Sequence, residues 1–395
     1  MKINLYCVLM SMVFIFLSAC SKDDPKPDSS INRTVLVYIA GDNSLRTFAA
    51  ADLEEMIVGM KTVDVSKNNL LVYYDNGSSA KLIHFTKDKK GNVVQDIVKD
   101  YGDRNSVGLT EMREVFSDTF NNYTATSYGI VFWSHGDGWI PASGSSRWFG
   151  QDGSKFMNIS TLSEALSVAP HLEFIFFDAC FMQSIEVIYE LRTYADYFVS
   201  SPTEIPAPGA PYQVVVPAMF VESKTAVKIA STYYEFHAGN YTKVPGANDP
   251  WDADGDWVAG VSTSVVVSSA LDNLAQETSR ILTKYAQSWV DLSDILCYDK
   301  RTSKYYYDLD GLMRILTGEN EDYGEWDKAY RAAVPYAETT ETNYSDYGRR
   351  FDMTGFRGVS TYIPKQGYSS LNSYYKTFQW YKAGGWENTG FIESN

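Results

Sequence analysis

Two short stretches of the sequence combine residue types that could cleave an amide bond. Residues 128–139 read YGIVFWSHGDGW and residues 174–184 read FIFFDACFMQS, so one apolar run is followed by His135 and the other by Cys180. A Cys thiolate is a nucleophile, and a neighbouring His can lower the thiol pKa and later protonate a leaving amine. Backbone N–H groups near Gly136 and at Cys180 could then form the oxyanion hole.

Other roles for these residues stay open when only their types are considered. A Cys after an apolar run can also be a small core residue or half of a disulfide. The other histidines, His84, His171 and His237, occupy a strand pattern, a loop opening and a helix face, where structural or solvated roles are usual. Ser134 lacks the GxSxG context of a serine hydrolase, and the motifs HExxH, GxxxxGKS/T and GxGxxG are absent.

The elements that must position His135 and Cys180 alternate between strand and helix. Strands are expected at 34–41, 69–75, 80–86, 129–133, 174–177 and 197–201, and helices after a cap at 42–44 and at 108–118, 160–168 and 183–194. This alternation predicts an α/β fold with a mostly parallel sheet and helices on both faces. Ligands bind beyond the carboxyl ends of such strands, and a crossover helix would make the two strands neighbours. His135 and Cys180 are therefore expected to face each other.

The second half of the chain has a different pattern. Beyond residue 220 the spacing is mainly helical, with one long amphipathic stretch at 265–296 and a late strand candidate, GVSTYIP, at 358–364. We therefore expect a catalytic core over 34–220 and a mainly helical region over 221–395 that completes the same domain.

The N-terminus has the features of an export signal. Residues 1–19 contain Lys2, an apolar stretch and small residues, which is typical of a secretory signal peptide. LSAC at 17–20 is similar to the bacterial lipobox, which predicts lipidation of Cys20, and residues 20–33 are expected to form a polar, flexible tether. The predicted location is the bacterial cell envelope, with a lipid anchor in the outer membrane or at the cell surface.

Composition narrows the class of protein. Hydrophobic residues make up 45% of the chain, charged residues 21%, and the net charge is −15. These values are typical of a globular protein, and the absence of a basic patch argues against nucleic acid as a partner. Of the four cysteines, Cys7 leaves with the signal and Cys20 is acylated, so only Cys180 and Cys297 could form a disulfide.

An ordered series of motifs resembles the clostripain family of cysteine peptidases, which shares a clan with caspases, legumain and gingipains. The series includes YIAGDNSL with DLEEM, GDRNSVGLTEMREVF at 102–116, the segment around His135, FDACFMQSIEVIYEL at 177–191 and GVSTYIP, and it covers nearly the whole chain from residue 34. The resemblance implies a caspase-like α/β/α sandwich and a His–Cys dyad at His135 and Cys180. One departure is Gly-Asp-Gly after His135, where the family usually has Gly-Gly-Gly.

The resemblance also implies which residue precedes the cut bond and how the enzyme is activated. Family members favour Arg or Lys before the cut bond, with a carboxylate in the pocket; the candidates here are Asp178 and, less directly, Glu204. Members often cut themselves between the His and the Cys. The Gly/Ser-rich segment 141–155 is expected to be an exposed, flexible loop in this region, and its basic residues Arg147 and Lys155 are the candidate cleavage sites.

Calcium is the one cofactor that the family suggests, and the chemistry itself requires none. WDADGDW at 251–257 places Asp252, Asp254 and Asp256 at alternate positions, although the spacing is not that of an EF-hand. A solvated acidic loop is the alternative for this segment.

The sequence thus predicts an exported, lipid-anchored and monomeric cysteine endopeptidase that acts on proteins or peptides after Arg or Lys. Two other functions stay open. One is a surface binding protein on a peptidase fold whose altered His loop has cost it activity. The other is a transpeptidase or amidase that uses the same dyad on cell-envelope peptides.

Overall fold

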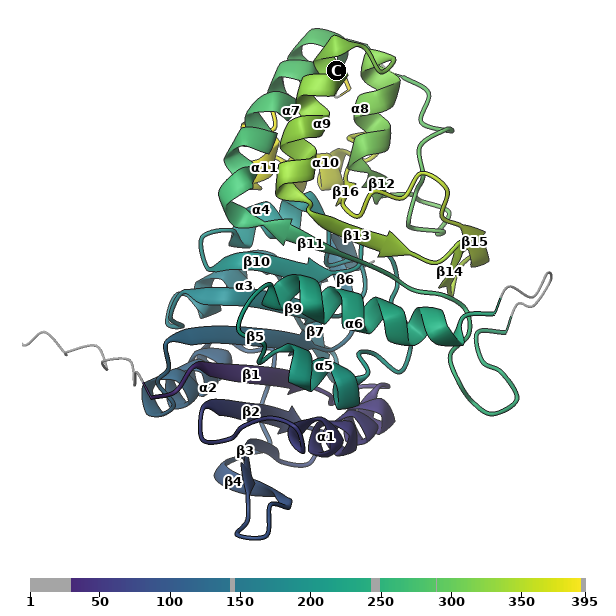
Figure 1. The fold of residues 1–395 in the computed structure, drawn as a ribbon. Helices are drawn as coiled ribbons and strands as arrows, with labels where there is room; N and C mark the ends of the chain where they lie inside the picture. The colour runs from purple at the N-terminus through teal and green to yellow at the C-terminus, as the bar shows by residue number, and fades with distance from the viewer. Residues whose placement is uncertain (1–29, 143–145, 243–248, 289, 392–395) are drawn as a thin grey trace, which may run out of the picture.

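The computed structural model describes residues 30–142, 146–242, 249–288 and 290–391, and its centre is one large twisted sheet (Figure 1). Five parallel strands form the middle of this sheet in the order β10-β9-β5-β1-β2. Their bounds are β1 (Arg33–Ala40), β2 (Asn68–Asp75), β5 (Ser127–Trp133), β9 (Leu172–Asp178) and β10 (Ala195–Ser200). Every residue of β1, RTVLVYIA, is buried, as expected for a parallel strand covered on both faces.

Antiparallel strands extend the sheet at both edges. On one side β2 is followed by β3 (Ala80–Lys87) and β4 (Val93–Gly102), and on the other β10 is followed by β11 (Ser262–Val267) and β13 (Tyr336–Thr339). β11 and β13 come from the region that the sequence predicts to be mainly helical. The stretch at 265–296 is accordingly not one amphipathic helix, because its first residues end a strand.

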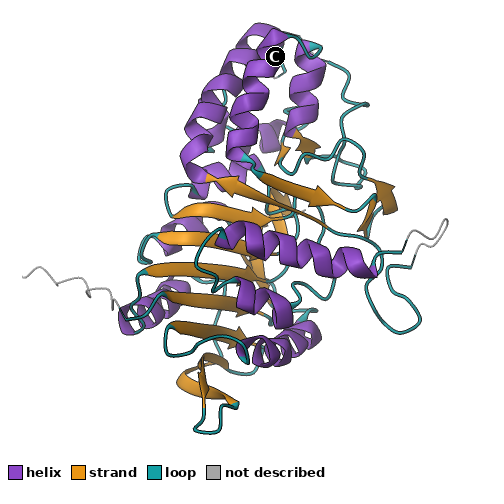
Figure 2. Ribbon diagram, in the orientation of Figure 1, coloured by secondary structure: helices purple, strands orange, loops and turns teal. Residues whose placement is uncertain are grey.

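Helices cover both faces of the sheet, which gives three layers (Figures 1 and 2). One face carries α1 (Arg46–Met60), α5 (Tyr212–Ala218) and α6 (Thr225–Asn240), and the other carries α2 (Leu109–Asn122), α3 (Ile159–Leu166) and α4 (Ile185–Leu191). The residues of β1 alternate between the two layers: Val35, Val37 and Ile39 pack with the first set, whereas Leu36, Tyr38 and Ala40 pack with the second. The predicted caspase-like α/β/α sandwich is confirmed.

The remaining C-terminal elements pack beyond β13 and continue the same hydrophobic core (Figure 1). The helices are α7 (Leu271–Tyr285), α8 (Leu309–Thr317), α9 (Glu321–Ala333), α10 (Ser369–Tyr375) and α11 (Gln379–Ala383), with short 3-10 turns at Ser268–Ala270 and Trp386–Asn388. Two small strand pairs lie beside them: β14 (Thr342–Ser345) with β15 (Arg349–Asp352), and β12 (Tyr307–Asp308) with β16 (Ser360–Thr361). The predicted strand at 358–364 is therefore a two-residue pair outside the main sheet.

A small antiparallel sheet replaces the loop that the sequence predicts between His135 and Cys180. Its strands are β6 (Gly136–Ala142), β7 (Ser146–Asp152) and β8 (Lys155–Met157). Within the ranges given above, no helix has both the length and the apolarity needed to cross a membrane.

Candidate active site

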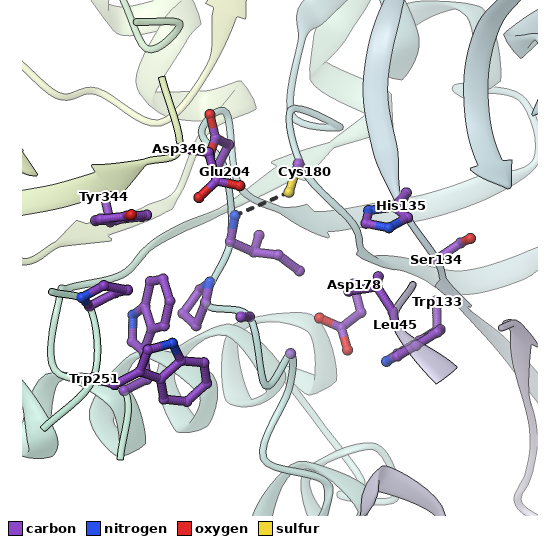
Figure 3. Close-up of a pocket in the computed structure, with 16 residues that line it drawn as sticks. Leu45, Trp133, Ser134, His135, Asp178, Cys180, Glu204, Trp251, Tyr344 and Asp346 are labelled. Carbon is purple, nitrogen blue, oxygen red and sulfur yellow. Dashed lines mark hydrogen bonds between the residues drawn. The ribbon is translucent and has the colours of Figure 1, made fainter. Parts of the chain in front are cut away.

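The carboxyl ends of β5 and β9 bring His135 and Cys180 to one edge of the sheet. The two strands are parallel neighbours with Trp133 opposite Asp178, so each candidate lies two residues past a matching strand end. Both side chains line a single cavity of about 200 Å³, shown in Figure 3. This geometry confirms the expected meeting of the two strand ends.

The backbone after Cys180 makes a tight turn that the core holds in place. Phe181 has φ of +60°, which is unusual for a residue other than glycine, and its N–H donates to the carbonyl of Thr203 at 2.9 Å. The buried Phe181 ring stacks on Tyr306 with centroids 4.9 Å apart. Such strain persists only where surrounding contacts impose it, and it is common at functional sites.

The Cys180 thiol is half-buried and free. Its Sγ accepts the Ile205 N–H at 3.4 Å, while Cys297 lies buried elsewhere and donates to the Asp299 carbonyl at 3.3 Å, so no disulfide joins the two cysteines that the structure describes. Burial, followed by the charge of Glu204, raises the pKa of the Cys180 thiol. The expected lowering of this pKa by His135 is therefore wrong for the free protein.

His135 lies beside Ser44, a residue that the sequence suggested only as part of a helix cap. His135 Nε2 and Ser44 Oγ are 2.8 Å apart, and burial lowers the pKa of the imidazole. The helix cap predicted at 42–44 is not formed: α1 begins at Arg46 without a side-chain cap, and Asn43 Oδ1 accepts the Leu45 N–H instead. A neutral imidazole next to a neutral thiol can accept the thiol proton when a substrate arrives.

The loop after His135 lies directly against the backbone of Cys180. A Cβ at Gly136 would lie 2.8 Å from the Cys180 carbonyl oxygen, so a larger residue would force the two segments apart. Asp137, the departure from the family pattern, is not among the residues that line the cavity, and it forms a two-point ion pair with Arg301 at 2.6 and 3.0 Å. The extra carboxylate thus connects the His loop to the C-terminal region.

Asp178 contributes a carboxylate to the cavity wall and uses only half of its hydrogen-bonding capacity. Its Oδ2 accepts the Ala210 N–H at 3.0 Å and the Tyr212 hydroxyl at 2.9 Å. Its Oδ1 is buried and has no hydrogen-bond partner among the described residues. Burial raises the pKa of Asp178 to about 6. A buried acceptor without a hydrogen-bond partner destabilises the folded protein unless a bound ligand donates a hydrogen bond to it.

Glu204 also lines the cavity, but both of its oxygens are already engaged. Oε1 accepts the Ser345 hydroxyl at 2.7 Å and Oε2 accepts the Asp346 N–H at 2.8 Å, which connects the segment after β10 to the β14–β15 hairpin. Burial raises the pKa of Glu204 to about 7. Of the two carboxylates predicted from the sequence, Asp178 therefore has a buried oxygen without a partner among the described residues, whereas both oxygens of Glu204 are engaged.

Comparison with protein families gives a match to the model of the clostripain family, Peptidase_C11, over residues 37–394. This chain belongs to the clostripain family. It is therefore a cysteine peptidase, and the positions of His135 and Cys180 fall within the matched region. A comparison with curated proteins gives no match.

Solved structures of clostripain-family enzymes share the fold. A secreted C11 cysteine protease from Bacteroides thetaiotaomicron, in complex with an irreversible peptide inhibitor, is 49% identical with a TM-score of 0.84, over 91% of this chain and 100% of that one. An inactive zymogen C11 protease from Parabacteroides distasonis is 30% identical with a TM-score of 0.76, over 90% and 98%. A clostripain from Bacteroides thetaiotaomicron with the peptide inhibitor BTN-VLTK-AOMK is 25% identical with a TM-score of 0.52, over 60% and 99%.

Within and directly after the segment predicted to be cut in this clostripain-family chain, residues 146–152 and 155–157 form paired strands. Arg147 lies in β7, where its backbone pairs with Pro141, and its side chain is outside the described part of the structure. Lys155 is exposed at the start of β8, opposite Asp152 across a turn at Gly153. The prediction of a flexible Gly/Ser loop over 141–155 is therefore wrong for 146–155, since strand pairing fixes that backbone.

The acidic segment at 251–257 forms a turn that is closed by its own hydrogen bonds. Across the described ranges, no group of three or more His, Cys, Asp or Glu side chains is placed to hold a metal ion. The Oδ1 of Asp252 accepts the N–H groups of Asp254 and Asp256, each at 2.9 Å, and all three residues are exposed. The geometry thus gives the predicted calcium site no support. The lipidation candidate Cys20 lies outside the described residues.

Proposed function

We propose that this chain is an exported endopeptidase in which Cys180 attacks the peptide carbonyl and His135 transfers the protons, with cleavage after Arg or Lys. One observation carries the proposal: the thiol, the imidazole and a buried carboxylate with an unpaired oxygen line the same cavity. A nucleophile beside a base, together with a charge that selects the substrate, is the minimum for specific peptide hydrolysis.

The proposed reaction begins from a neutral pair. As the Cys180 sulfur attacks the carbonyl carbon, its proton passes to His135, and Ser44 holds the imidazole in position. The oxyanion receives N–H donors from the backbone at Cys180 and from the loop at Gly136. His135 then protonates the leaving amine, and the resulting thioester is hydrolysed by water that His135 deprotonates. No metal or cofactor enters these steps.

The preference for a basic residue rests on Asp178. A guanidinium or ammonium group that reaches Oδ1 would give the buried carboxylate its missing hydrogen bond and a charge partner. Arg can do so with better geometry than Lys. The clostripain relative crystallised with an inhibitor containing VLTK provides a parallel, because that peptide ends in Lys. The Tyr212 hydroxyl, which the sequence did not single out, fixes Oδ2 and leaves Oδ1 for the substrate.

A library of short peptides tests the proposal as a whole. Purified soluble protein and its Cys180→Ala variant would be incubated with peptides that vary at the residue before the cut bond, and products would be identified by mass spectrometry. Hydrolysis after Arg and Lys by the wild type alone supports the proposal. Ligation products would support a transpeptidase, and binding without cleavage would support a surface binding protein.

The pH dependence of kcat/KM for Arg substrates should show a steep acid limb. Burial raises the pKa of Asp178 to about 6, so this carboxyl is neutral and unable to pair with the substrate cation below that pH. His135 must also be neutral to act as a base, and burial lowers its pKa. The rise of kcat/KM with pH should therefore level off above the Asp178 pKa of about 6. Because burial also raises the pKa of Glu204, in the same cavity, to about 7, the Asp178→Asn variant is the control that isolates the Asp178 contribution. An acid limb of unchanged steepness in that variant contradicts the assignment.

We also propose that the chain matures by cutting itself after Arg147, or secondarily after Lys155. One relative is described as an inactive zymogen, and both residues lie between His135 and Cys180 in the sequence. Since β7 must first separate from its neighbours, self-cutting should be slower than cleavage of a flexible peptide. Mass spectrometry should find two fragments of the active wild type and an intact Cys180→Ala chain. An uncut chain at full activity would refute this step.

The lipid anchor gives a separate prediction about location. Cys20→Ser should abolish labelling by a fatty-acid probe and move the protein from the membrane fraction to the soluble fraction, since one Cys carries the whole anchor. Cys297→Ser serves as the matched control and should leave both properties unchanged. A wild-type chain without lipid would show that residues 17–20 act only as an ordinary cleavage site.

A further inference from the structure

The cavity that holds Cys180 and Asp178 has a second, aromatic wall. Trp251, Trp257 and Tyr344 line it, and Figure 3 shows Trp251 and Tyr344 across the cavity from His135 and Asp178. The Trp251 and Trp257 rings meet edge to face at 5.4 Å, and Trp257 meets Tyr344 in the same way at 5.6 Å. Phe48 of α1 stacks on Trp251 at 6.3 Å, so this aromatic wall is supported from outside the cavity.

The aromatic wall offers apolar surface rather than hydrogen-bonding groups. The Trp257 Nε1–H donates to the Gly260 carbonyl at 2.8 Å, and the Tyr344 hydroxyl accepts from Arg349 at 3.0 Å. Two of its three polar atoms are therefore already used within the protein. Pro206, Pro250 and Ala207 line the cavity beside these rings and add further apolar surface.

The acidic turn at 252–256 explains how Trp251 is held in the aromatic wall. Trp251 and Trp257 form an antiparallel bridge, and the Asp252 N–H donates to the Asp256 carbonyl at 3.0 Å. Because the Asp252 carboxylate also accepts two backbone N–H groups, the turn closes a short hairpin whose two ends carry the tryptophans. The motif considered for calcium thus positions a cavity wall.

We infer that the aromatic wall binds a large apolar side chain of the substrate, on one of the two residues that precede the basic residue. This inference rests on the proposed function, since Cys180, His135 and Asp178 set the direction of the bound peptide. His135 must face the leaving amine, so the residues after the cut bond extend toward His135. The residues before it extend to the opposite side of Cys180, where the aromatic wall lies (Figure 3).

Fluorogenic peptides ending in Arg, with Gly, Leu, Phe or Lys at each of the two preceding positions, provide the test. At one position, kcat/KM for Leu or Phe should exceed that for Gly by about 10- to 100-fold, as expected for filling an apolar pocket. Trp251→Ala should reduce that ratio at least fivefold, and Trp251→Phe should restore most of it. Phe236→Ala, which removes an exposed aromatic ring on α6 away from the cavity, should keep the wild-type ratio.

The wild-type ratios of kcat/KM for apolar residues over Gly test the inference even if a Trp251 variant unfolds. Thermal melting would show such unfolding. Equal rates for Gly and Phe at both positions, or a preference for Lys, would overturn the inference. So would an unchanged ratio in folded Trp251→Ala. In those cases the proposed function stands as long as Arg is still preferred before the cut bond, whereas loss of that preference would overturn the proposed function itself.

Discussion

Replacing Cys180 with Ala should reduce kcat/KM for peptide hydrolysis by on the order of 10⁴-fold or more, because removal of a catalytic nucleophile leaves only binding and oxyanion stabilisation. The half-buried side chain lies at a cavity wall, so the loss of one sulfur atom should leave the melting temperature nearly unchanged. Steady-state kinetics and thermal melting of the same preparation provide the two readouts.

His135→Ala and Cys297→Ala complete this experiment. His135→Ala should lose activity to a similar degree, since the neutral thiol has a raised pKa and needs a base. Cys297→Ala removes a buried thiol from another part of the core and should leave hydrolysis near the wild-type rate, although it costs some stability. Full activity in the Cys180→Ala protein would rule out the mechanism.

Asp178→Asn should remove the preference for a basic residue before the cut bond. Breaking a buried charge pair costs about 2–5 kcal/mol, which corresponds to roughly 30- to several-thousand-fold in kcat/KM. The sharpest readout is the ratio of kcat/KM for an Arg peptide to that for its citrulline analogue, which has nearly the same shape but no charge. In the wild type this ratio should be large, and in Asp178→Asn it should approach one.

Glu204→Gln is the matched control for Asp178→Asn. Glu204 also lines the cavity, but Ser345 and Asp346 occupy its oxygens, so the amide should keep the preference for Arg over citrulline. The opposite pattern, in which Gln at 204 loses the preference and Asn at 178 retains it, would transfer the specificity role to Glu204.

The sequence predicted the framework of the site because that framework depends on local patterns. An apolar run such as TVLVYIA indicates a strand buried on both faces, and β1 is indeed covered by helices on each side. The rule that parallel strands present their carboxyl ends at one edge was enough to bring His135 and Cys180 together.

The contacts that tune the site could not be predicted in this way, because they join residues far apart in the chain. Ser44 is 91 residues from His135, Tyr212 is 34 from Asp178, and Arg301 is 164 from Asp137. No periodicity relates such pairs. The expected His-lowered thiol pKa failed for the same reason, since it depends on burial and on the position of Glu204.

Composition alone does not determine the backbone structure of two short segments. Gly and Ser at 141–155 indicated a flexible loop, but Ser146–Asp152 pairs as a strand between two others. Alternating Asp residues at 252–256 suggested metal ligands. In the structure, the Oδ1 of Asp252 accepts hydrogen bonds from backbone N–H groups of its own turn. In both segments hydrogen bonds to backbone groups determine the structure, and these bonds cannot be predicted from side-chain type alone.

Mass spectrometry of the protein after treatment with an irreversible peptide inhibitor ending in Arg shows directly whether Cys180 is the nucleophile. We expect one inhibitor per chain, attached to the peptide that contains Cys180, with none on Cys297 and complete loss of hydrolysis when labelling is complete. His135→Ala should label much more slowly, because the thiol then lacks its base. Hydrolysis that continues at the full rate after Cys180 is quantitatively blocked would show that another residue is the nucleophile.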